Sequence, residues 1–332
     1  MLLGGRAAFV DILSDYNISG SGIFGAMPNT LAHLGIQGLL TRTAIREADL
    51  KWVYLGCVLP DIPWILQRLG RVLVPPTWFF DLWLYAIVQT SLLFCCCLAG
   101  ALSVWSNRPW RTFAILIFGS TLHLLLDATQ TKWGNGVHLF APFSWELINF
   151  GWYWPEEIPT LALTAFGLAF AVYMLWKVRI YYEDLQVPQG RSLTVAFLCL
   201  ILYIAAPPLL FAGPEAADNQ YIRTLKERDL RVGRTIEMDR RPLTRRADEW
   251  VLTTHNGEEL LVHGNDNRAS GIVSFKGIFI EPSTVEAVAI YKHSGRLRDL
   301  PSMLGLGLVT LIWVWAIYAR CRSRGLGEET SS

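Results

Sequence analysis

The sequence is short of charged residues, which make up 17% of its 332 residues, whereas hydrophobic residues make up 52%. Soluble domains carry about 25% charged residues, and the mean hydropathy here is +0.32. The deficit argues against an ordinary soluble enzyme. We therefore expect a protein of the lipid bilayer, with membrane lipid as its first partner.

An excess of charge of either sign is also lacking, with 29 Lys and Arg against 28 Asp and Glu. Proteins that bind nucleic acid generally display a basic patch or stripe over a domain with a high pI. The near balance of charge therefore predicts no nucleic-acid partner.

Cysteines are few and badly placed for disulfides. Of the six, none lies between residues 213 and 300, so that segment can form no disulfide framework. The triplet Cys95–Cys97 lacks both the CxxC spacing of a zinc site and a nearby histidine. We interpret these cysteines as packing residues.

Residues 1–26 lack the basic start and apolar core of a signal peptide, because Asp11 and Asp15 interrupt the only apolar run. We interpret them as an outer N-terminal tail. Met27 is an alternative translation start, which leaves the choice between Met1 and Met27 open.

Long hydrophobic runs dominate the rest of the chain. A membrane-spanning helix needs about 20 apolar residues, and five stretches approach that length, whereas two earlier ones are shorter and interrupted by polar residues or prolines. The five are Phe79–Trp105, Phe113–Leu126 with its flanks, Ile158–Trp176, Leu193–Ala212 and Met303–Ala319, and the two short ones are Pro28–Leu40 and Trp52–Leu69. The pattern predicts an α-helical polytopic membrane protein with about seven helices.

Residues 213–300 contrast with these runs because they hold 28 of the 57 charged side chains. We interpret them as a small extracytoplasmic all-β domain inserted before the last helix. The full division is a tail (1–26), a helical membrane domain (27–212), the β domain (213–300), a C-terminal transmembrane helix (301–320) and a cytoplasmic tail (321–332).

Orientation follows from basic residues in the short loops, which mark the cytoplasmic side. Those predicted on one side are Arg42, Arg46, Lys51, Arg108, Arg111, Lys177, Arg179, Arg191, Arg320, Arg322 and Arg324, against Arg68, Arg71 and Lys132 on the other. The bias predicts a multi-pass protein of the bacterial inner membrane, with residues 213–300 on the periplasmic side.

Strands are expected within the charged segment. Asp248–His255 and Glu258–His263 flank Asn256-Gly257, a dipeptide that favours a type I′ hairpin turn. Gly271–Ile280 and Thr284–Tyr291 predict two more strands, within a sheet or barrel of four to six. The Arg-rich stretch Arg240, Arg241, Arg245 and Arg246 favours a solvated loop, with contact to headgroups or a partner as the alternative.

Ionisable residues inside membrane segments are costly and therefore mark candidate functional sites. Four stand out: His33, Asp61, His123 and Asp127. His123 and Asp127 are four residues apart and share a helix face, and the predicted topology brings all four to a similar depth. They form a candidate divalent-metal site, zinc in the first instance, with a hydrogen-bonded histidine–carboxylate pair as the alternative.

The motifs around these residues resemble a known family. They are Met27-Pro-Asn-Thr-Leu-Ala-His33, Gly56-Cys-Val-Leu-Pro-Asp61-Ile and His123-Leu-Leu-Leu-Asp127-Ala-Thr, followed by Gly136 and Leu139-Phe-Ala-Pro142-Phe. This stretch, roughly residues 27–180, resembles the LexA-regulated, membrane-bound family of predicted metal-dependent hydrolases, which is similar to zinc-dependent phospholipase C. The resemblance implies a multi-helix membrane protein whose His and Asp residues bind metal for hydrolysis of a phosphoester in lipid.

Two positions depart from the family pattern. Pro63 stands where the family has a second Asp, and Gln89-Thr90-Ser91 stands where it has Thr-His-Ser. A single-metal site needs only three protein ligands and water, and His138 is the nearest substitute ligand. Glu156 and Glu157 could act as a general base, although acidic residues are common at helix starts, and His255 and His263 are expected at the surface.

Two functions remain open. The first is a membrane-bound metal-dependent hydrolase-like protein that acts on a phosphoester or lipid at the outer leaflet. The second is a non-catalytic structural or accessory subunit of a larger membrane complex, built on a degenerate hydrolase scaffold and bound to other membrane-protein subunits. Metal content and co-purifying partners distinguish them.

Overall fold

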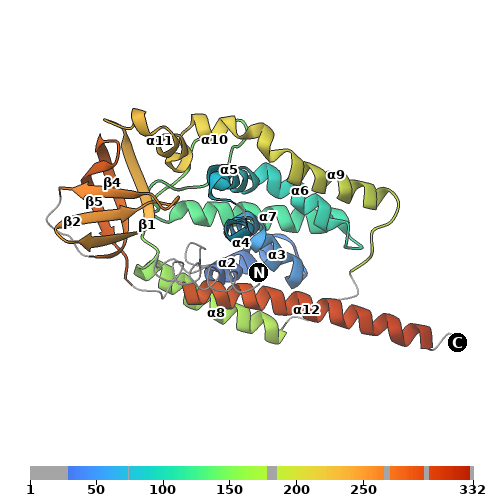
Figure 1. Ribbon diagram of the computed structural model, residues 1–332. Helices are drawn as coiled ribbons and strands as arrows, with labels where there is room; N and C mark the ends of the chain where they lie inside the picture. Colours follow the sequence, from blue (N-terminus) through green and yellow to red (C-terminus); the bar gives the residue numbers. More distant parts are fainter. Residues whose placement is uncertain (1–28, 74, 178–184, 265–269, 295–298, 330–332) are drawn as a thin grey trace, which may run out of the picture.

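A computed structural model describes residues 29–73, 75–177, 185–264, 270–294 and 299–329. The N-terminal tail 1–26 and the choice of start codon lie outside these residues. Figure 1 shows helices gathered into a bundle, with a small barrel of strands at one end and the long last helix running along the bundle. The barrel is inserted in the sequence before that helix, as the distribution of charge predicts.

The helical elements are listed here in chain order. They are α2 (Thr30–Ala44), α3 (Leu50–Val58), η1 (Leu59–Asp61), α4 (Ile62–Leu73), η2 (Pro76–Trp78), α5 (Phe79–Gln89), α6 (Leu92–Ser103), α7 (Pro109–Thr129), α8 (Ile158–Lys177), α9 (Arg191–Ala205), η3 (Pro207–Leu210), α10 (Ala212–Ala216), η4 (Asn219–Tyr221), α11 (Ile222–Lys226), η5 (Arg228–Leu230) and α12 (Asp299–Glu329).

The number of helices that could cross a membrane is smaller than predicted. Within the described ranges, α7, α8 and residues 300–322 of α12 are each long and apolar enough, and two bent pairs raise the number to five at most. α5 and α6 meet at 73°, and α9 meets the segment from Pro207 to Ala216 at 49°. The prediction of about seven is therefore wrong, because α2 and α3 have only 15 and 9 residues and a crossing needs about 20.

Glycines allow the central helices to touch. A Cβ on Gly35 of α2 would lie 2.2 Å from the Cα of Gly167 on α8, and one on Gly119 of α7 would lie 3.0 Å from the carbonyl carbon of Gly56 on α3. Small residues at such contacts let helix backbones approach closely inside a membrane. These contacts bring α2 against α8 and α3 against α7, and α2 and α7 carry three of the four residues of the candidate site.

The strands form a closed barrel in the order β1-β2-β3-β5-β4. Their bounds are β1 (Thr235–Arg246), β2 (Glu249–Thr253), β3 (Glu259–His263), β4 (Gly271–Glu281) and β5 (Thr284–Lys292). All pairs are antiparallel except β3 with β5. The five strands confirm the predicted four to six, and Ile236, Leu252, Phe275 and Val285 fill the interior.

The predicted hairpin is present, but its turn differs. Thr253 pairs with Glu259, and the backbone N–H of Thr254 donates to the carbonyl of Glu258 at 2.8 Å. In this described turn Gly257 has φ 83° and Asn256 is not among the residues of positive φ. A type I′ turn needs positive φ at both central residues, so that prediction is wrong. The loop is a three-residue connection whose last residue is left-handed.

Two other expectations for the charged segment are also wrong in part. Its first residues, up to Leu230, form short helices rather than strands. The Arg-rich stretch is not a solvated loop but lies in β1, where the chain bulges between Met238 and Arg241. Arg245 and Arg246 remain exposed, whereas half-buried Arg241 donates to the carbonyls of Thr253 and Thr254, at 3.0 Å each.

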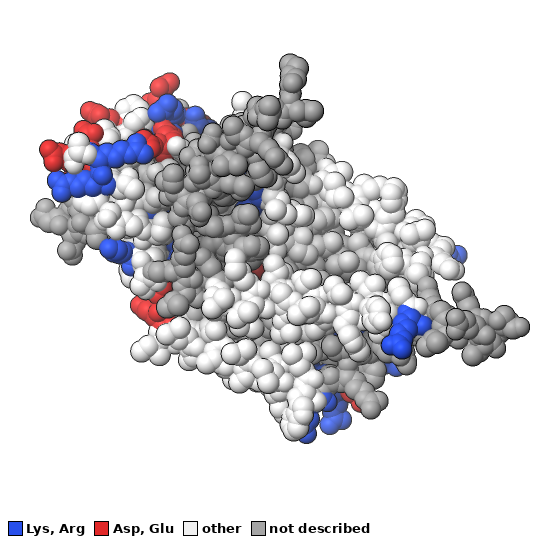
Figure 2. Space-filling model, turned by 60° about the horizontal axis from the view of Figure 1, so that its bottom comes forward, with Lys and Arg blue, Asp and Glu red and all other residues white. Residues whose placement is uncertain are grey.

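Charge is distributed along the molecule in keeping with a membrane protein. Figure 2 shows a broad surface without charged side chains between the barrel, where both signs gather, and a few basic side chains at the opposite end. Large apolar side chains of the bundle helices, such as Leu161, Phe197 and Leu311, are exposed by 59%, 62% and 68%. Such an apolar face matches the hydrocarbon of a bilayer.

Candidate metal centre

The bundle brings together the four ionisable residues that the sequence singles out. His33 lies on α2, whose first turn is capped by the side chain of Asn29. Asp61 is the last residue of η1, a 3₁₀ turn that follows α3 and has Pro60 near its start. His123 and Asp127 lie one turn apart near the end of α7. We call these four residues the bundle cluster.

Distances within the bundle cluster are short. His33 Nε2 lies 3.3 Å from Asp127 Oδ1, and His123 Nε2 lies 3.5 Å from Asp61 Oδ1 and 3.8 Å from Asp127 Oδ2. The two imidazoles are stacked with ring centroids 4.3 Å apart. His33, His123 and Asp61 are buried, and Asp127 is 14% exposed. The predicted convergence is confirmed for all four side chains.

The outer partners of both imidazoles fix their tautomers. His123 Nδ1 lies 2.6 Å from the carbonyl of Cys57, and a carbonyl can only accept, so Nδ1 carries the proton. The Gln37 amide is oriented by its neighbours: its nitrogen donates to the Gly119 carbonyl at 2.8 Å, and its oxygen accepts from His33 Nδ1 at 3.1 Å. When either imidazole is neutral, it therefore directs an Nε2 lone pair into the bundle cluster.

With neutral imidazoles, this arrangement places acceptors against acceptors. Each Nε2 lone pair faces a carboxylate oxygen, and the buried Oδ1 of Asp127 has no hydrogen-bond partner among the described residues. A cation between these atoms would resolve the conflict. One ligand atom each from His33, His123 and Asp127 lies within 4.8 Å of the others. Tetrahedral zinc, with bonds of about 2.0–2.2 Å, needs its ligand atoms roughly 3.3–3.6 Å apart.

The residues present thus fit a divalent metal held by two imidazoles and a carboxylate. Carbonyls that hold the second nitrogen of ligating imidazoles are the usual outer shell of zinc sites. Here the Cys57 carbonyl and the Gln37 amide supply that shell. Asp61 stands beside His123 as a fourth ligand or as a proton acceptor.

Lys132 is a member of this site that sequence reasoning missed. Its Nζ lies 3.1 Å from Asp127 Oδ2, and the residue is 7% exposed. From the sequence, Lys132 is only a basic residue of an outer loop. Its side chain folds back on α7 to reach Asp127, and no local pattern predicts that direction.

Other candidate ligands lie elsewhere. His138 packs against Trp145, with ring centroids 5.8 Å apart, and its Nδ1 lies 3.5 Å from the Asn219 amide. Burial lowers the pKa of His138 to about 4, so the ring is neutral at physiological pH. It is outside the only metal-ligand group found among the described residues. The prediction of His138 as a substitute ligand therefore has no support.

The two hairpin histidines differ from each other. His263 is exposed at the end of β3, as predicted. His255 is half-buried and meets Trp83 of α5, with ring centroids 4.6 Å apart. Burial, together with the charges of Arg241 and Arg71, lowers the pKa of His255 well below its usual value. A surface role for His255 is wrong, because the residue joins the barrel to the bundle.

A second histidine–carboxylate cluster lies where the barrel meets the segment before α8. Glu156 Oε1 accepts from Arg240 and from His293 Nδ1, the latter at 2.9 Å. His293 Nε2 lies 2.8 Å from Ser274 Oγ, which also lies 2.7 Å from Asp239 Oδ1. We call Glu156, Asp239, Arg240, Ser274 and His293 the junction cluster.

In the junction cluster, Ser274, His293 and Glu156 contact one another in the order of a Ser–His–acid triad. Unlike the serine of such a triad, Ser274 is not accessible to a substrate. Ser274 is fully buried, its hydroxyl donates to Asp239, and His293 Nε2 lies 2.8 Å from the same oxygen. A nucleophile must reach its substrate, so this hydroxyl serves packing. Hydrogen bonds from His293 and the charge of Arg240 outweigh burial and lower the pKa of Glu156 to about 2.

Glu157 plays a simpler part. Its carboxylate accepts from the backbone N–H of Trp154 at 3.2 Å, which is the helix-start role that the sequence favours over a general base. Glu156 instead has the interdomain role above, for which sequence reasoning had no signal, because His293 is 137 residues away.

Comparisons with protein-family models, with curated proteins and with solved structures gave no match to this chain.

Proposed function

We propose that the chain is a membrane-bound, metal-dependent hydrolase in which His33, His123 and Asp127 hold one divalent ion, zinc in the first instance. The observation that carries the proposal is the pair of imidazole lone pairs aimed at carboxylate oxygens in a buried site. Between neutral imidazoles and carboxylates, such contacts cost free energy because buried acceptors have no donor, and a divalent cation removes that cost. The resemblance of the motifs to metal-dependent hydrolases supports the same conclusion.

A bound divalent ion would supply Lewis acidity and a water of lowered pKa. The chain itself supplies Asp61, whose carboxylate lies 3.5 Å from His123 Nε2 and can take up a proton. Lys132 balances the second oxygen of Asp127 and orients that carboxylate.

The proposed substrate is a phosphoester or another lipid bond at the outer leaflet of the bacterial inner membrane. Three observations support this location: the basic loops at the end far from the barrel, the charged barrel, and the aromatic side chains exposed on the segment between α7 and α8. Aromatic belts form at membrane–water interfaces. In this proposal residues 213–300 face the periplasm and membrane lipid is the partner.

The test is metal analysis of protein purified in detergent, with release of phosphorylated headgroups from phospholipid vesicles as the second measurement. We expect about one equivalent of zinc per chain and none after His123→Ala. His263→Ala, which removes an exposed histidine of the barrel, is the matched control and keeps the metal. Native protein that holds no metal and takes none up would overturn the proposal.

A second function is favoured by one observation, the ammonium group of Lys132 on Asp127. With that cation present, a single proton neutralises the remaining charge of the two carboxylates, and no metal is needed. Together with Pro63 and the missing histidine at residues 89–91, this supports a non-catalytic accessory subunit bound to other membrane-protein subunits. It predicts metal-free protein that co-purifies with a partner in mild detergent.

A further inference from the structure

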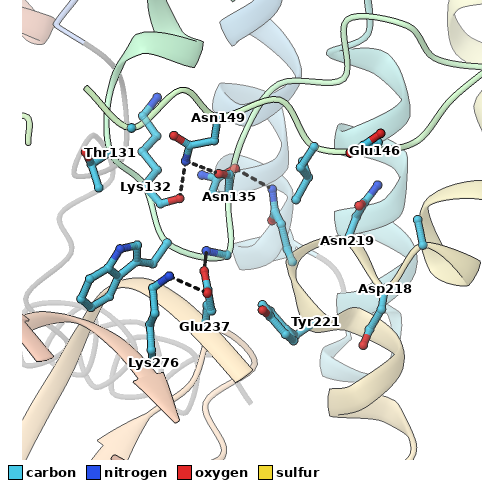
Figure 3. Close-up of a pocket in the computed structure, with 16 residues that line it drawn as sticks. Thr131, Lys132, Asn135, Glu146, Asn149, Asp218, Asn219, Tyr221, Glu237 and Lys276 are labelled. Atoms are coloured by element: carbon cyan, nitrogen blue, oxygen red, sulfur yellow. Dashed lines mark hydrogen bonds and ion pairs between the residues drawn. The ribbon is translucent and has the colours of Figure 1, made fainter. Parts of the chain in front are cut away.

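A cavity of about 800 Å³ lies between the bundle and the barrel, outside the bundle cluster. Three segments line it: the segment after α7 with Trp133, Asn135 and Asn149, the segment 217–221 before α11, and the barrel with Glu237 and Lys276. Figure 3 shows these three walls facing one another. The volume is that of a small-molecule site, typically 300–1,000 Å³.

Backbone strain is concentrated in one wall of the cavity. Asp218, Gln220 and Tyr221 have φ values of 51°, 53° and 59°, and they are half of the six described non-glycine residues with positive φ. Such conformations cost about 1–3 kcal/mol each and cluster at ligand sites. Here Gln220 is held by its amide, which donates to Asn135 at 3.1 Å, and Asp218 by its carboxylate, which accepts from Thr224.

The charges around the cavity disfavour an anion, because the carboxylates of Glu146, Asp218 and Glu237 all line it. Lys276 pairs with Glu237 at 2.7 Å and lies over the Trp133 ring at 5.0 Å. The ammonium group of Lys132 points away from the cavity in Figure 3, toward Asp127. No lining lysine is therefore left to bind a phosphate. A quaternary ammonium would have to displace Lys276 from the Trp133 face.

Side-chain amides dominate what remains. Asn135, Asn149, Asn219 and Gln220 all line the cavity, and an amide both donates and accepts hydrogen bonds. Sugar hydroxyls have the same dual character. The amide nitrogens of Asn149 and Asn219 donate to backbone carbonyls, so these two residues offer mainly their oxygens to a ligand. Tyr221 adds a phenol whose pKa is raised to about 12 by burial and by nearby Glu237 and Asp218, so the hydroxyl stays neutral. Trp133 adds an apolar ring.

We propose that this cavity binds a neutral polyhydroxylated group, that is, a sugar. The site is distinct from the proposed metal centre and does not depend on metal. Phe143 and Trp152, on the segment that forms one wall, are exposed by 97% and 71%, which places the cavity next to a membrane surface. The sugar can therefore be the headgroup of a glycolipid or a soluble saccharide.

The experiment uses the full chain, solubilised in a polyoxyethylene detergent because sugar detergents would compete. Saturation-transfer NMR is recorded with maltose, with sn-glycerol 3-phosphate and with choline as separate probes. In a second arm, nanodiscs contain a monoglucosyl diacylglycerol, and native mass spectrometry measures how much of it stays with the protein. We expect maltose or the glycolipid to bind, and neither charged probe to do so. Binding in only one arm identifies the source of the sugar.

Asn149→Ala, which removes an exposed amide of the wall, should weaken sugar binding at least tenfold. Asn107→Ala, at an exposed asparagine next to α7 but away from the cavity, is the matched control and should bind as the wild type does. Trp133→Ala is the second cavity variant if Asn149→Ala folds poorly.

Zinc is measured in the same samples, so that loss of metal and loss of sugar are separate results. Absence of binding in both arms, preference for either charged probe, or unchanged binding in folded cavity variants would overturn the proposal.

Discussion

The bundle cluster and the junction cluster use the same residue types and differ in their donors. In the junction cluster, Arg240 and His293 both donate to Glu156. In the bundle cluster, imidazole lone pairs face the carboxylates of Asp61 and Asp127, and the one ammonium group, Lys132, reaches a single oxygen. A buried polar group stabilises a fold only when it is paired.

The comparison therefore teaches that histidine next to a carboxylate is not by itself a functional signal. What matters is which imidazole nitrogen faces the carboxylate and what holds the other one. At the junction, the nitrogen facing Glu156 is Nδ1, and the remaining nitrogen meets the hydroxyl of Ser274. In the bundle, the Cys57 carbonyl and the Gln37 amide oxygen accept hydrogen bonds from the Nδ1 atoms, and the Nε2 atoms face the carboxylates. In our proposal the junction is closed by its two donors on Glu156 Oε1, although Oε2 has no partner among the described residues, and the bundle takes a cation.

The largest effect is expected when the junction loses its arginine. Arg240→Met leaves Glu156 buried without its guanidinium partner, and breaking a buried pair costs about 3–5 kcal/mol. Thermal unfolding should show the loss, and protease should cut the barrel sooner. Arg245→Met is the control, since that ion pair is exposed and worth less than about 1 kcal/mol. Equal effects of the two substitutions would contradict the proposed closure.

Acid should open the same junction. The pKa of Glu156 is about 2 in the fold against an ordinary 4.5, so its contribution to stability is complete above pH 4.5. It is lost as the pH falls toward 2, and it amounts to about 3 kcal/mol. Stability measured against pH should show this fall in the wild type, and Glu156→Gln should flatten it. Glu146→Gln, at an exposed position, should leave the curve unchanged.

Metal should act on the bundle alone. Zinc at 100 times its dissociation constant should stabilise the wild type by about 2.7 kcal/mol, measured as a rise in the unfolding temperature that a chelator reverses. His123→Asn should remove this response to zinc. His293→Asn should lower the stability measured without zinc and leave the response to zinc unchanged. A response lost in both variants would mean that the two clusters are not independent.

The smallest effect is expected from packing. A methyl group on Gly119 would meet Gly56 at 3.0–3.1 Å, and overpacking of this kind costs about 1–3 kcal/mol. Gly119→Ala should therefore separate α3 from α7, draw His123 away from Asp61, and reduce zinc content. Gly307→Ala is the control, because a Cβ there has no neighbour within 4 Å. Full zinc content in Gly119→Ala would show that the contact does not position the site.

The candidate site was accessible to sequence reasoning because its cues are local. His123 and Asp127 lie one helical turn apart. An ionisable residue within an apolar run is a candidate functional residue because placing it in the membrane costs free energy. The helices α7 and α8 were predicted for a similar reason, since their apolar runs are long and uninterrupted. The same reasoning could not find Lys132, which acts through a side chain that folds back on the preceding helix.

The misses have physical causes. Thr90 and Ser91 divide one apolar run into α5 and α6. Two small polar residues do not by themselves predict the 73° bend between these helices. In β1 the bulge at Met238/Arg241 interrupts the two-residue alternation that marks a strand. The junction cluster joins residues 137 positions apart, and no local pattern encodes such a contact.

The barrel has a consequence for how any protein partner could bind. Each of its five strands has two neighbours, so closure leaves no strand free on either side. A peptide therefore cannot bind this barrel by extending a sheet edge. For the same reason, two barrels cannot aggregate edge to edge. A partner of the charged face must recognise side chains, and its affinity will then respond to ionic strength.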